Sequence, residues 1–288
     1  MTAELPPIVC CVDQQYIQPL MVMMESLAAV PQNAGLALMI LHQGLPTDDR
    51  SRVSRHAERL TLNLTFHQAP STPTGPVTGW VSETVYLRLA IGDLFAHHGT
   101  VLYLDADTLV LGDLHPLLLT SLEGRALGAV RDPQNPRVGM GMALPGWADL
   151  GLAAGCDYFN SGVMLLDLAE CEHQNVFTSA QRFLVEHPDH VTFWDQDALN
   201  VAMSGRWLRL DRRWNTFALS PLVAAGGYRH DDAEPYSPLA MLLADEPGAS
   251  ILHFAGPAKP WQDKYPPGRL RGLYRHFQHL VERASDAR

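Results

Sequence analysis

Residues 101–114 of the chain read VLYLDADTLVLGDL, two apolar runs separated by the acidic triplet Asp105-Ala106-Asp107. The first run is typical of a buried β-strand, so the two carboxylates come directly after a strand end. In an extended segment residues i and i+2 point the same way, and we therefore expect both carboxylates on one face. Two carboxylates so near each other repel unless a cation lies between them, and hard divalent ions prefer such oxygen ligands. The alternative is a polar strand end with two solvated acids.

Short apolar runs alternate with longer helical patterns along the rest of the chain, which predicts an α/β protein with crossover helices. We expect further strands at residues 8–12, 36–42, 62–67, 126–130, 162–166 and 250–254. We expect helices at residues 16–29, after an N-cap at Thr47, from Ser82 to about Phe95, and at residues 195–203. Residues 67–80, 133–156 and 216–249 are expected to be loops, and the glycines and prolines of 133–156 indicate a long mobile one.

The last part of the chain has a different pattern. After Pro266 and Pro267, apolar residues recur at helical spacing between Leu270 and Val281, with arginines and histidines between them. We therefore expect a single domain at residues 1–265 and an amphipathic basic helix within 266–288. Two interpretations of this helix stay open: peripheral contact with a membrane, or packing on the body of the protein with a solvated basic face.

Composition excludes several classes of protein. The chain has 31 acidic and 21 basic residues and a formal net charge of −10, which argues against a nucleic-acid binder and against docking of the whole body on an anionic membrane. Its four cysteines have no CxxC spacing, which is typical of reduced thiols in a cytosolic protein. We find no signal peptide and no apolar run near the ~20 residues of a membrane span, and expect a cytoplasmic chain.

A histidine in the segment ILHFAGPAKPW, residues 251–261, supports the metal interpretation of the two aspartates. His253 ends a predicted strand, and two carboxylates with one imidazole suit manganese. Gly256 allows the backbone to approach a ligand closely, and Lys259, one of only two lysines, offers a point charge suited to phosphate. The pattern indicates a diphosphate held between a metal ion and a lysine. The alternative is a histidine that is merely packed.

These two segments together resemble glycosyltransferase family 8. Further matches are IVCCVDQQY (residues 8–16), SETVYLRLAIGDLF (82–95), DYFNSGVMLLDL (157–168) and WDQDALN (194–200), so the resemblance runs from residue 8 to 265 in the family's order. It implies a GT-A fold, with a Rossmann-like mixed sheet flanked by helices, and a UDP-glucose or UDP-galactose donor. It also implies Mn²⁺, with Mg²⁺ as a substitute, and transfer with retention of configuration to a hydroxyl of a carbohydrate or other acceptor.

The resemblance also implies roles for individual residues. Asp105, Asp107 and His253 look like metal ligands. The implied nucleotide-binding residues are Cys11, Val12, Asp13, Tyr16, Asp105, Ala106, Gly256 and Lys259, with Tyr16 stacking on uracil. The implied donor-sugar residues are Arg88, Asp132, Asn160, Ser161, Asp195 and Gln196. From sequence alone, Arg88 could be a solvated surface charge, Asp195 a helix cap, and Asn160-Ser161-Gly162 a simple turn.

The implied catalytic residues are Gln196 and Asp195. The amide of Gln196 is a poor nucleophile, so we favour attack of the acceptor on the sugar face that the leaving group occupied. In the less favoured mechanism, Asp195 acts as a transient nucleophile. Two other functions stay open. The DxD after an apolar strand also marks haloacid-dehalogenase-type phosphatases, and a non-catalytic binder of nucleotide sugars would carry the same ligands. The acceptor, which the three expected loops would surround, is not named by any motif.

Overall fold

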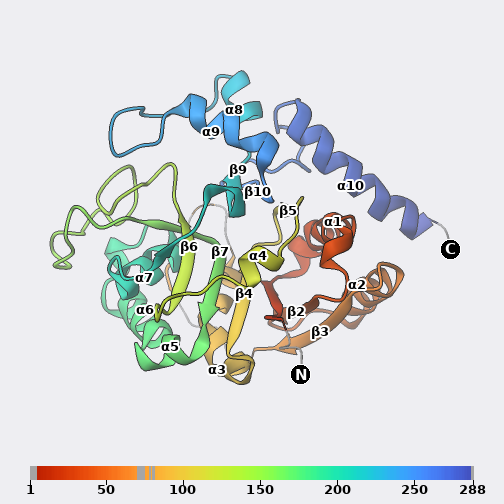
Figure 1. Ribbon diagram of the computed structural model, residues 1–288, viewed down its shortest axis with the longest axis horizontal. Coiled ribbons are helices and arrows are strands. Elements are labelled where there is room, and N and C mark those ends of the chain that lie inside the picture. The colour runs from red at the N-terminus through yellow and green to blue at the C-terminus, as the bar shows by residue number, and fades with distance from the viewer. Residues whose placement is uncertain (1–4, 70–74, 78, 80–81, 287–288) are drawn as a thin grey trace.

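The protein is represented by a computed structural model that describes residues 5–69, 75–77, 79 and 82–286 (Figure 1). A seven-stranded sheet with the order β3-β2-β1-β4-β7-β6-β8 lies beside a three-stranded sheet with the order β5-β10-β9. The strands are β1 (Ile8–Cys11), β2 (Ala37–His42), β3 (Asn63–Gln68), β4 (Thr100–Leu104), β5 (Thr108–Val110), β6 (Leu127–Arg131), β7 (Phe159–Asp167), β8 (Leu208–Arg209), β9 (Thr216–Phe217) and β10 (Ile251–His253).

The central strands are continuous apolar runs because both faces of the sheet are buried. In β1, the side chains of Ile8 and Cys10 belong to one hydrophobic core, whereas those of Val9 and Cys11 belong to the other. Strands β3, β2, β1 and β4 run parallel, and β7 runs antiparallel to both β4 and β6. The strands β4 and β6 therefore end at the same edge of the sheet, where β7 begins.

Helices cover both faces of this sheet. The helices are α1 (Ile17–Ala28), α2 (Thr47–Arg59), α3 (Ile91–Phe95), α4 (His115–Leu118), α5 (Leu168–His173), α6 (Val176–Glu186), α7 (Trp194–Met203), α8 (Ser220–Ala224), α9 (Leu239–Asp245) and α10 (Arg269–Asp286). Buried side chains of α1, α2, α4 and α10 fill the first core, and those of α3, α5, α6 and α7 fill the second. The layers agree with the predicted α/β class (Figure 1).

The small sheet places two distant segments beside each other. Strand β5 follows β4 after the triplet at residues 105–107, and it pairs antiparallel with β10, where Thr108 lies opposite His253. Strand β9 pairs with the other side of β10, with Phe217 opposite His253. The end of β10 therefore lies close to the two aspartates of the triplet.

The C-terminal helix α10 lies against α1 (Figure 1). Its apolar face, which includes Leu270, Tyr274, Phe277 and Val281, is buried in the first core. The amphipathic pattern is thus used for packing on the body of the protein. Within the described residues, we find no helix that is both long and apolar enough to cross a membrane.

Most elements expected from the sequence are present, with bounds that differ by one to three residues. Three details are wrong. Thr47 is the first residue of α2 and not its N-cap, because Pro46 occupies that position. Residues 83–90 form a 3₁₀ helix, and the α-helix α3 begins only at Ile91. The expected loop 216–249 contains β9, α8 and α9.

Of the other two expected loops, one is present and the other is described only in part. Residues 133–156 form turns with a single isolated bridge between Arg137 and Asp157, as expected for a loop. Of the loop expected at residues 67–80, residues 70–74, 78 and 80 lie outside the described part of the chain. All four cysteines are free thiols, as the absence of CxxC spacing indicates.

Candidate active site

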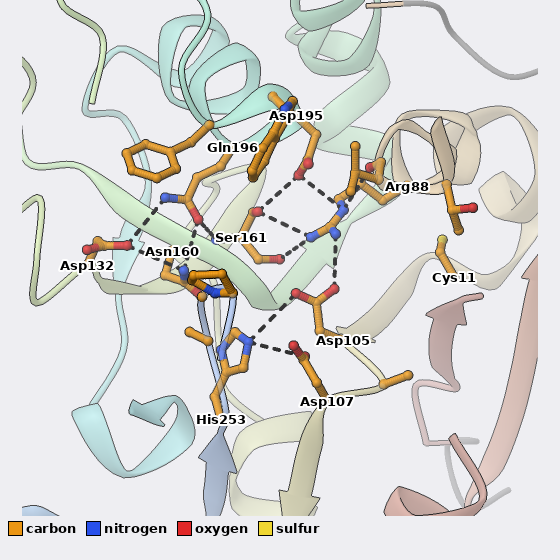
Figure 2. A pocket seen from close by; sticks show the side chains of 18 of the residues that line it. Cys11, Arg88, Asp105, Asp107, Asp132, Asn160, Ser161, Asp195, Gln196 and His253 are labelled. Atoms are coloured by element: carbon orange, nitrogen blue, oxygen red, sulfur yellow. Dashed lines mark hydrogen bonds and ion pairs between the residues drawn. The ribbon is translucent and has the colours of Figure 1, made fainter. Parts of the chain in front are cut away.

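One cavity of about 470 Å³ contains almost every residue to which the sequence analysis assigns a role (Figure 2). The topology explains this convergence. Asp13, Asp105 and Asp132 each follow the carboxyl end of a strand, namely β1, β4 and β6. The antiparallel strand β7 begins at the same edge and supplies Asn160 and Ser161. Ligand sites of open α/β sheets lie at this edge, outside the carboxyl ends of the parallel strands.

Asp105, Asp107 and His253 form a cluster in which the potential ligand atoms lie within 4.8 Å of one another. The Nε2 atom of His253 is 3.3 Å from Oδ1 of Asp107 and 3.9 Å from Oδ2 of Asp105. The expected extended geometry of residues 105–107 is wrong, because these residues form a turn between β4 and β5. The carboxylates converge through this turn, and the register of β5 with β10 adds the imidazole.

The surroundings of the cluster fit a divalent cation. Oδ1 of Asp107 is buried and accepts no hydrogen bond from any residue that the structure describes. The nearby Gly162 is also required, because a Cβ atom there would lie 2.3 Å from Cε1 of His253 and 2.9 Å from Oδ2 of Asp105. Since Asp107 is only 6% exposed, the alternative of two solvated acids is wrong.

Lys259 is the positive group beside this cluster. Its ammonium group contacts Oδ2 of Asp107 and donates to the carbonyl of Phe254 at 2.9 Å. Burial alone would raise the pKa of Asp107, but the positive charge of Lys259 outweighs it and holds that pKa below its usual range. Gly256, on the loop between His253 and Lys259, has a φ of +88°, which favours glycine.

Arg88 joins the cluster of Asp105, Asp107 and His253 to the next part of the cavity (Figure 2). Its guanidinium group is 3.0 Å from Oδ1 of Asp105 and 3.1 Å from Oδ2 of Asp195, and it also donates to the backbone carbonyl of Ser161. The centroid of the Tyr103 ring lies 4.5 Å from Cζ of Arg88. Arg88 is 6% exposed, so its interpretation as a solvated surface charge is wrong.

Asp195 is buried in the first turn of α7 and does more than cap that helix. Its carboxylate accepts hydrogen bonds from Ser161 Oγ and from Arg88. Burial raises its pKa to about 6, although Arg88 acts in the opposite direction. A carboxyl group with such a pKa, next to a fixed guanidinium group, is typical of functional sites.

The amide of Gln196 is held in one orientation. Its oxygen accepts from the backbone N–H of Ser161 at 3.0 Å and from the amide of Asn160 at 2.9 Å. Its nitrogen donates to Asp132 Oδ2 at 3.3 Å and to the hydroxyl of Tyr158 at 3.2 Å. The backbone N–H of Ser161 can only donate, so it fixes which end of the amide faces it. Asn160 thus belongs to a side-chain network as well as to a turn.

Asp13, which follows the carboxyl end of β1, also lines the cavity. One carboxylate oxygen accepts the backbone N–H groups of Gln15 and Tyr16, and the other accepts the hydroxyls of Ser82 and Thr84. Cys11, Tyr16 and Ala106 also line the cavity. Val12 does not line it, because its side chain is buried and its N–H donates to the carbonyl of Leu41.

Several residues of the site were not singled out from the sequence. Asp197 accepts from the hydroxyl of Tyr158 at 2.6 Å, and both lie within quoted motifs, WDQDALN and DYFNSGVMLLDL. Ser82 and Thr84 also lie in a quoted motif. Met142, Phe193 and Trp194 line the cavity, and no motif or charge pattern marks Met142. Asn215, which contacts His253, lies outside every motif.

Comparison with known proteins decides the family. The family model described as "Glycosyl transferase family 8" matches residues 7–265. The chain belongs to glycosyltransferase family 8. Members of this family generally depend on a divalent metal ion, and the cluster of Asp105, Asp107 and His253 is present here. The phosphatase alternative is therefore wrong.

Individual known proteins resemble the chain along most of its length. It is 26% identical to general stress protein A of Bacillus subtilis, over 97% of this chain and 95% of that protein. It is 25% identical to the lipopolysaccharide 1,2-glucosyltransferase of Escherichia coli K12, over 90% of this chain and 74% of that protein. The structure of the galactosyltransferase LgtC in complex with donor and acceptor sugar analogues superposes with a TM-score of 0.76 at 27% identity, covering 96% of this chain and 95% of LgtC. The predicted GT-A fold is confirmed.

Proposed function

We propose that the chain is a metal-dependent hexosyltransferase that moves glucose or galactose from a UDP-sugar to a hydroxyl of a saccharide or other acceptor, with retention of configuration. This proposal rests mainly on the arrangement of one cavity. The cluster of Asp105, Asp107 and His253 lies next to Lys259, and Arg88 connects the cluster to Asp195. The family supports it, since relatives include a lipopolysaccharide glucosyltransferase and a lipopolysaccharide 1,3-galactosyltransferase.

Asp105, Asp107 and His253 would hold the metal ion, for which we propose Mn²⁺, with Mg²⁺ as a substitute. Two carboxylates and one imidazole suit Mn²⁺, which accepts nitrogen as readily as oxygen. When bound, the ion would act as a Lewis acid on the diphosphate leaving group. Lys259 and the glycine turn at Gly256 would bind the same diphosphate, because both line the cavity beside the cluster.

The uridine and the hexose of the donor would bind in different parts of the cavity. The uridine would lie at Asp13, Cys11 and Tyr16, with Ala106 and the backbone at Val12 beside it. The hexose would lie in the other half of the cavity, which is lined by Arg88, Asp132, Asn160, Ser161, Asp195 and Gln196. In this arrangement Arg88 faces both halves, since it contacts Asp105 and Asp195.

The chemistry follows from how Gln196 and Asp195 are held. The oxygen of Gln196 already accepts two hydrogen bonds, and Asp195 is paired with Arg88, so neither is a free nucleophile. We therefore propose that the bond between the anomeric carbon and UDP breaks first, and that the acceptor oxygen bonds to the same face of the sugar. The acceptor proton passes to an oxygen of the departing diphosphate. Gln196 and Asp195 stabilise the positive charge of the sugar from the opposite face.

We also propose that residues 1–265 form the transferase domain, with a C-terminal amphipathic basic helix within residues 266–288, in a cytoplasmic protein. The family match at residues 7–265 supports that boundary. Any contact with the inner face of the membrane would use the basic side of α10, because its apolar side is buried. On that side Arg271 and Arg275 donate to backbone carbonyls of the body, whereas Arg269 and Arg283 are exposed. At about 1 kcal/mol per arginine the attraction is weak, and flotation with phosphatidylserine vesicles at low salt tests it.

A donor panel tests the proposed function. The purified chain is incubated with Mn²⁺ and each of several UDP-sugars, with simple saccharides as acceptors, and the release of UDP and the anomeric configuration of the product are measured. We expect turnover with UDP-glucose or UDP-galactose and an α-linked product from the α-linked donor. An inverted product contradicts the proposed geometry. Binding of UDP-sugar without any UDP release, with or without acceptor, favours a non-catalytic binder.

A further inference from the structure

Asn215 lies outside the cavity, in the turn before β9, yet it contacts two residues of the site. It is 3% exposed. Its side-chain oxygen is 2.9 Å from Nδ1 of His253, and its side-chain nitrogen is 2.8 Å from Oδ1 of Asn160. It therefore lies between a metal-cluster residue and a residue of the sugar half of the cavity.

The orientation of the Asn215 amide is fixed by a backbone group. Oδ1 of Asn160 accepts the backbone N–H of Gly162 at 3.1 Å. Because a backbone N–H can only donate, the atom of Asn160 that faces it is the oxygen. The Asn215 atom next to this oxygen must then be the amide nitrogen, since two oxygens at 2.8 Å would repel each other. The oxygen of Asn215 consequently faces His253.

This orientation decides which ring nitrogen of His253 carries the proton. An amide oxygen can only accept, so Nδ1 of His253 must be the protonated nitrogen of the neutral ring. The lone pair then lies on Nε2, the atom that faces Asp105 and Asp107. Oδ1 of Asp107 lies 3.3 Å from this Nε2.

We propose that Asn215 is a positioning residue that holds His253 in the tautomer and ring orientation that a metal ligand requires. Metal-bound histidines generally donate their second ring N–H to such a partner, and loss of the partner weakens metal binding. The Phe217 ring packs against the same imidazole in a T-shaped arrangement, with 5.5 Å between the two ring centroids, and restrains it. The inference rests on the proposed function insofar as the cluster binds a metal ion.

The tautomer can be measured without any metal. Long-range ¹H–¹⁵N NMR spectra of the metal-free chain distinguish the two neutral tautomers, and the signals that disappear in a His253→Gln variant belong to His253. We expect a protonated Nδ1 and an unprotonated Nε2 in the wild-type chain, and a shift of the proton to Nε2 in Asn215→Leu. A wild-type ring protonated on Nε2 overturns the proposal, whatever the enzyme's activity.

Metal binding gives the second readout. Free Mn²⁺ is measured by electron paramagnetic resonance without nucleotide, on variants shown by circular dichroism to be folded. We expect Asn215→Leu to bind Mn²⁺ about 10–100-fold more weakly. Asn215→Asp should restore binding to within about threefold of the wild-type affinity, because a carboxylate oxygen also accepts from Nδ1.

Asn33 offers a matched control, because it is equally buried and bonds the backbone at Gly112 and Leu114, away from the cavity. Asn33→Leu should leave the Mn²⁺ affinity unchanged. Wild-type affinity in Asn215→Leu, or an Asn215→Asp variant as weak as Asn215→Leu, overturns the proposal. If the wild-type chain binds no Mn²⁺, the proposed metal site fails, and the NMR result alone decides the role of Asn215.

Discussion

The ammonium group of Lys259 contacts one oxygen of the Asp107 carboxylate, and the other oxygen faces Nε2 of His253. Lys259 therefore supplies positive charge at the place where the proposed metal ion would supply it. A cation in this position would compete with the metal for Asp107 before the nucleotide binds. Once a diphosphate is present, the same cation would have an anionic partner of its own.

The Lys259→Met substitution should consequently have opposite effects on two ligands. We expect the affinity for UDP to fall about 10–100-fold, the loss of one charge-assisted contact. We expect the affinity for Mn²⁺ without nucleotide to rise, because the competing charge is removed. Isothermal titration calorimetry measures both. Lys264, the other lysine of the chain, is exposed, and Lys264→Met is the control that should change neither. A parallel loss of both affinities would contradict this competition.

Arg88 should be needed for the stability of the fold as well as for the donor site. Its guanidinium group is buried between Asp105 and Asp195, so Arg88→Met leaves two carboxylates without their shared partner. We expect the free energy of unfolding in urea to fall by about 3–5 kcal/mol. The exposed Arg55→Met on α2 should change it by less than about 0.5 kcal/mol. Equal stability of the two variants would show that the buried pair does not contribute.

Asp197 should make stability depend on pH in a defined direction. Burial raises its pKa from 3.8 to about 6, against hydrogen bonds from Tyr158 and from backbone N–H groups. A carboxyl group whose pKa is higher in the folded state contributes stability below its unfolded pKa and loses it as pH rises through the folded pKa. The contribution of Asp197 should thus fall by at most about 3 kcal/mol between pH 4 and pH 7.

The Asp197→Asn variant isolates this contribution. The difference in unfolding free energy between wild type and variant should be larger at pH 4 than at pH 7. Asp195 titrates in both proteins, so its effect cancels in the difference. A difference that is constant, or that grows toward pH 7, contradicts the raised pKa. Urea unfolding at several pH values provides the measurement.

Helix α10 should behave as part of the folded body. Phe277 is buried against the first core, so Phe277→Ala should lower the free energy of unfolding by about 3–5 kcal/mol. His276 on the same helix is exposed, and His276→Ala should change it by less than about 0.5 kcal/mol. If both variants were as stable as the wild type, the apolar face of α10 would be available for a membrane instead.

The parts of the site that the sequence predicts are those encoded by neighbouring residues. Asp105 and Asp107 follow an apolar run that is typical of a buried strand, and His253 ends another such run. Their convergence depends on the antiparallel pairing of β5, which follows the triplet, with β10, which ends at His253. Arg88 differs, because its partner Asp195 is far along the chain, and helical residues 83–90 are compatible with either a surface or a buried arginine. Only the packing of α7 against this segment decides between them.

Other features could not be predicted because tertiary contacts override the local pattern. Thr47 is a good N-cap residue, but Pro46 takes the N-cap position, so Thr47 is the first residue of the helix and its hydroxyl accepts a hydrogen bond from Arg50. Helices α8 and α9 have five and seven residues, too few for an amphipathic period to show. Asn215 has no local signal at all, since its role depends on the pairing of β9 with β10.

In the proposed mechanism, Asp105, Asp107 and His253 bind a metal ion on which sugar transfer depends. The most direct measurement is the rate of UDP release from UDP-glucose and UDP-galactose as Mn²⁺ is added after treatment with EDTA. It is made on the wild type, on Asp107→Asn and on Asp48→Asn, an exposed residue of α2. We predict no release without metal, saturable release with Mn²⁺ in the wild type and in Asp48→Asn, and a loss of at least about 10³-fold in Asp107→Asn. Release that does not need metal, or that Asp107→Asn retains, would contradict the account.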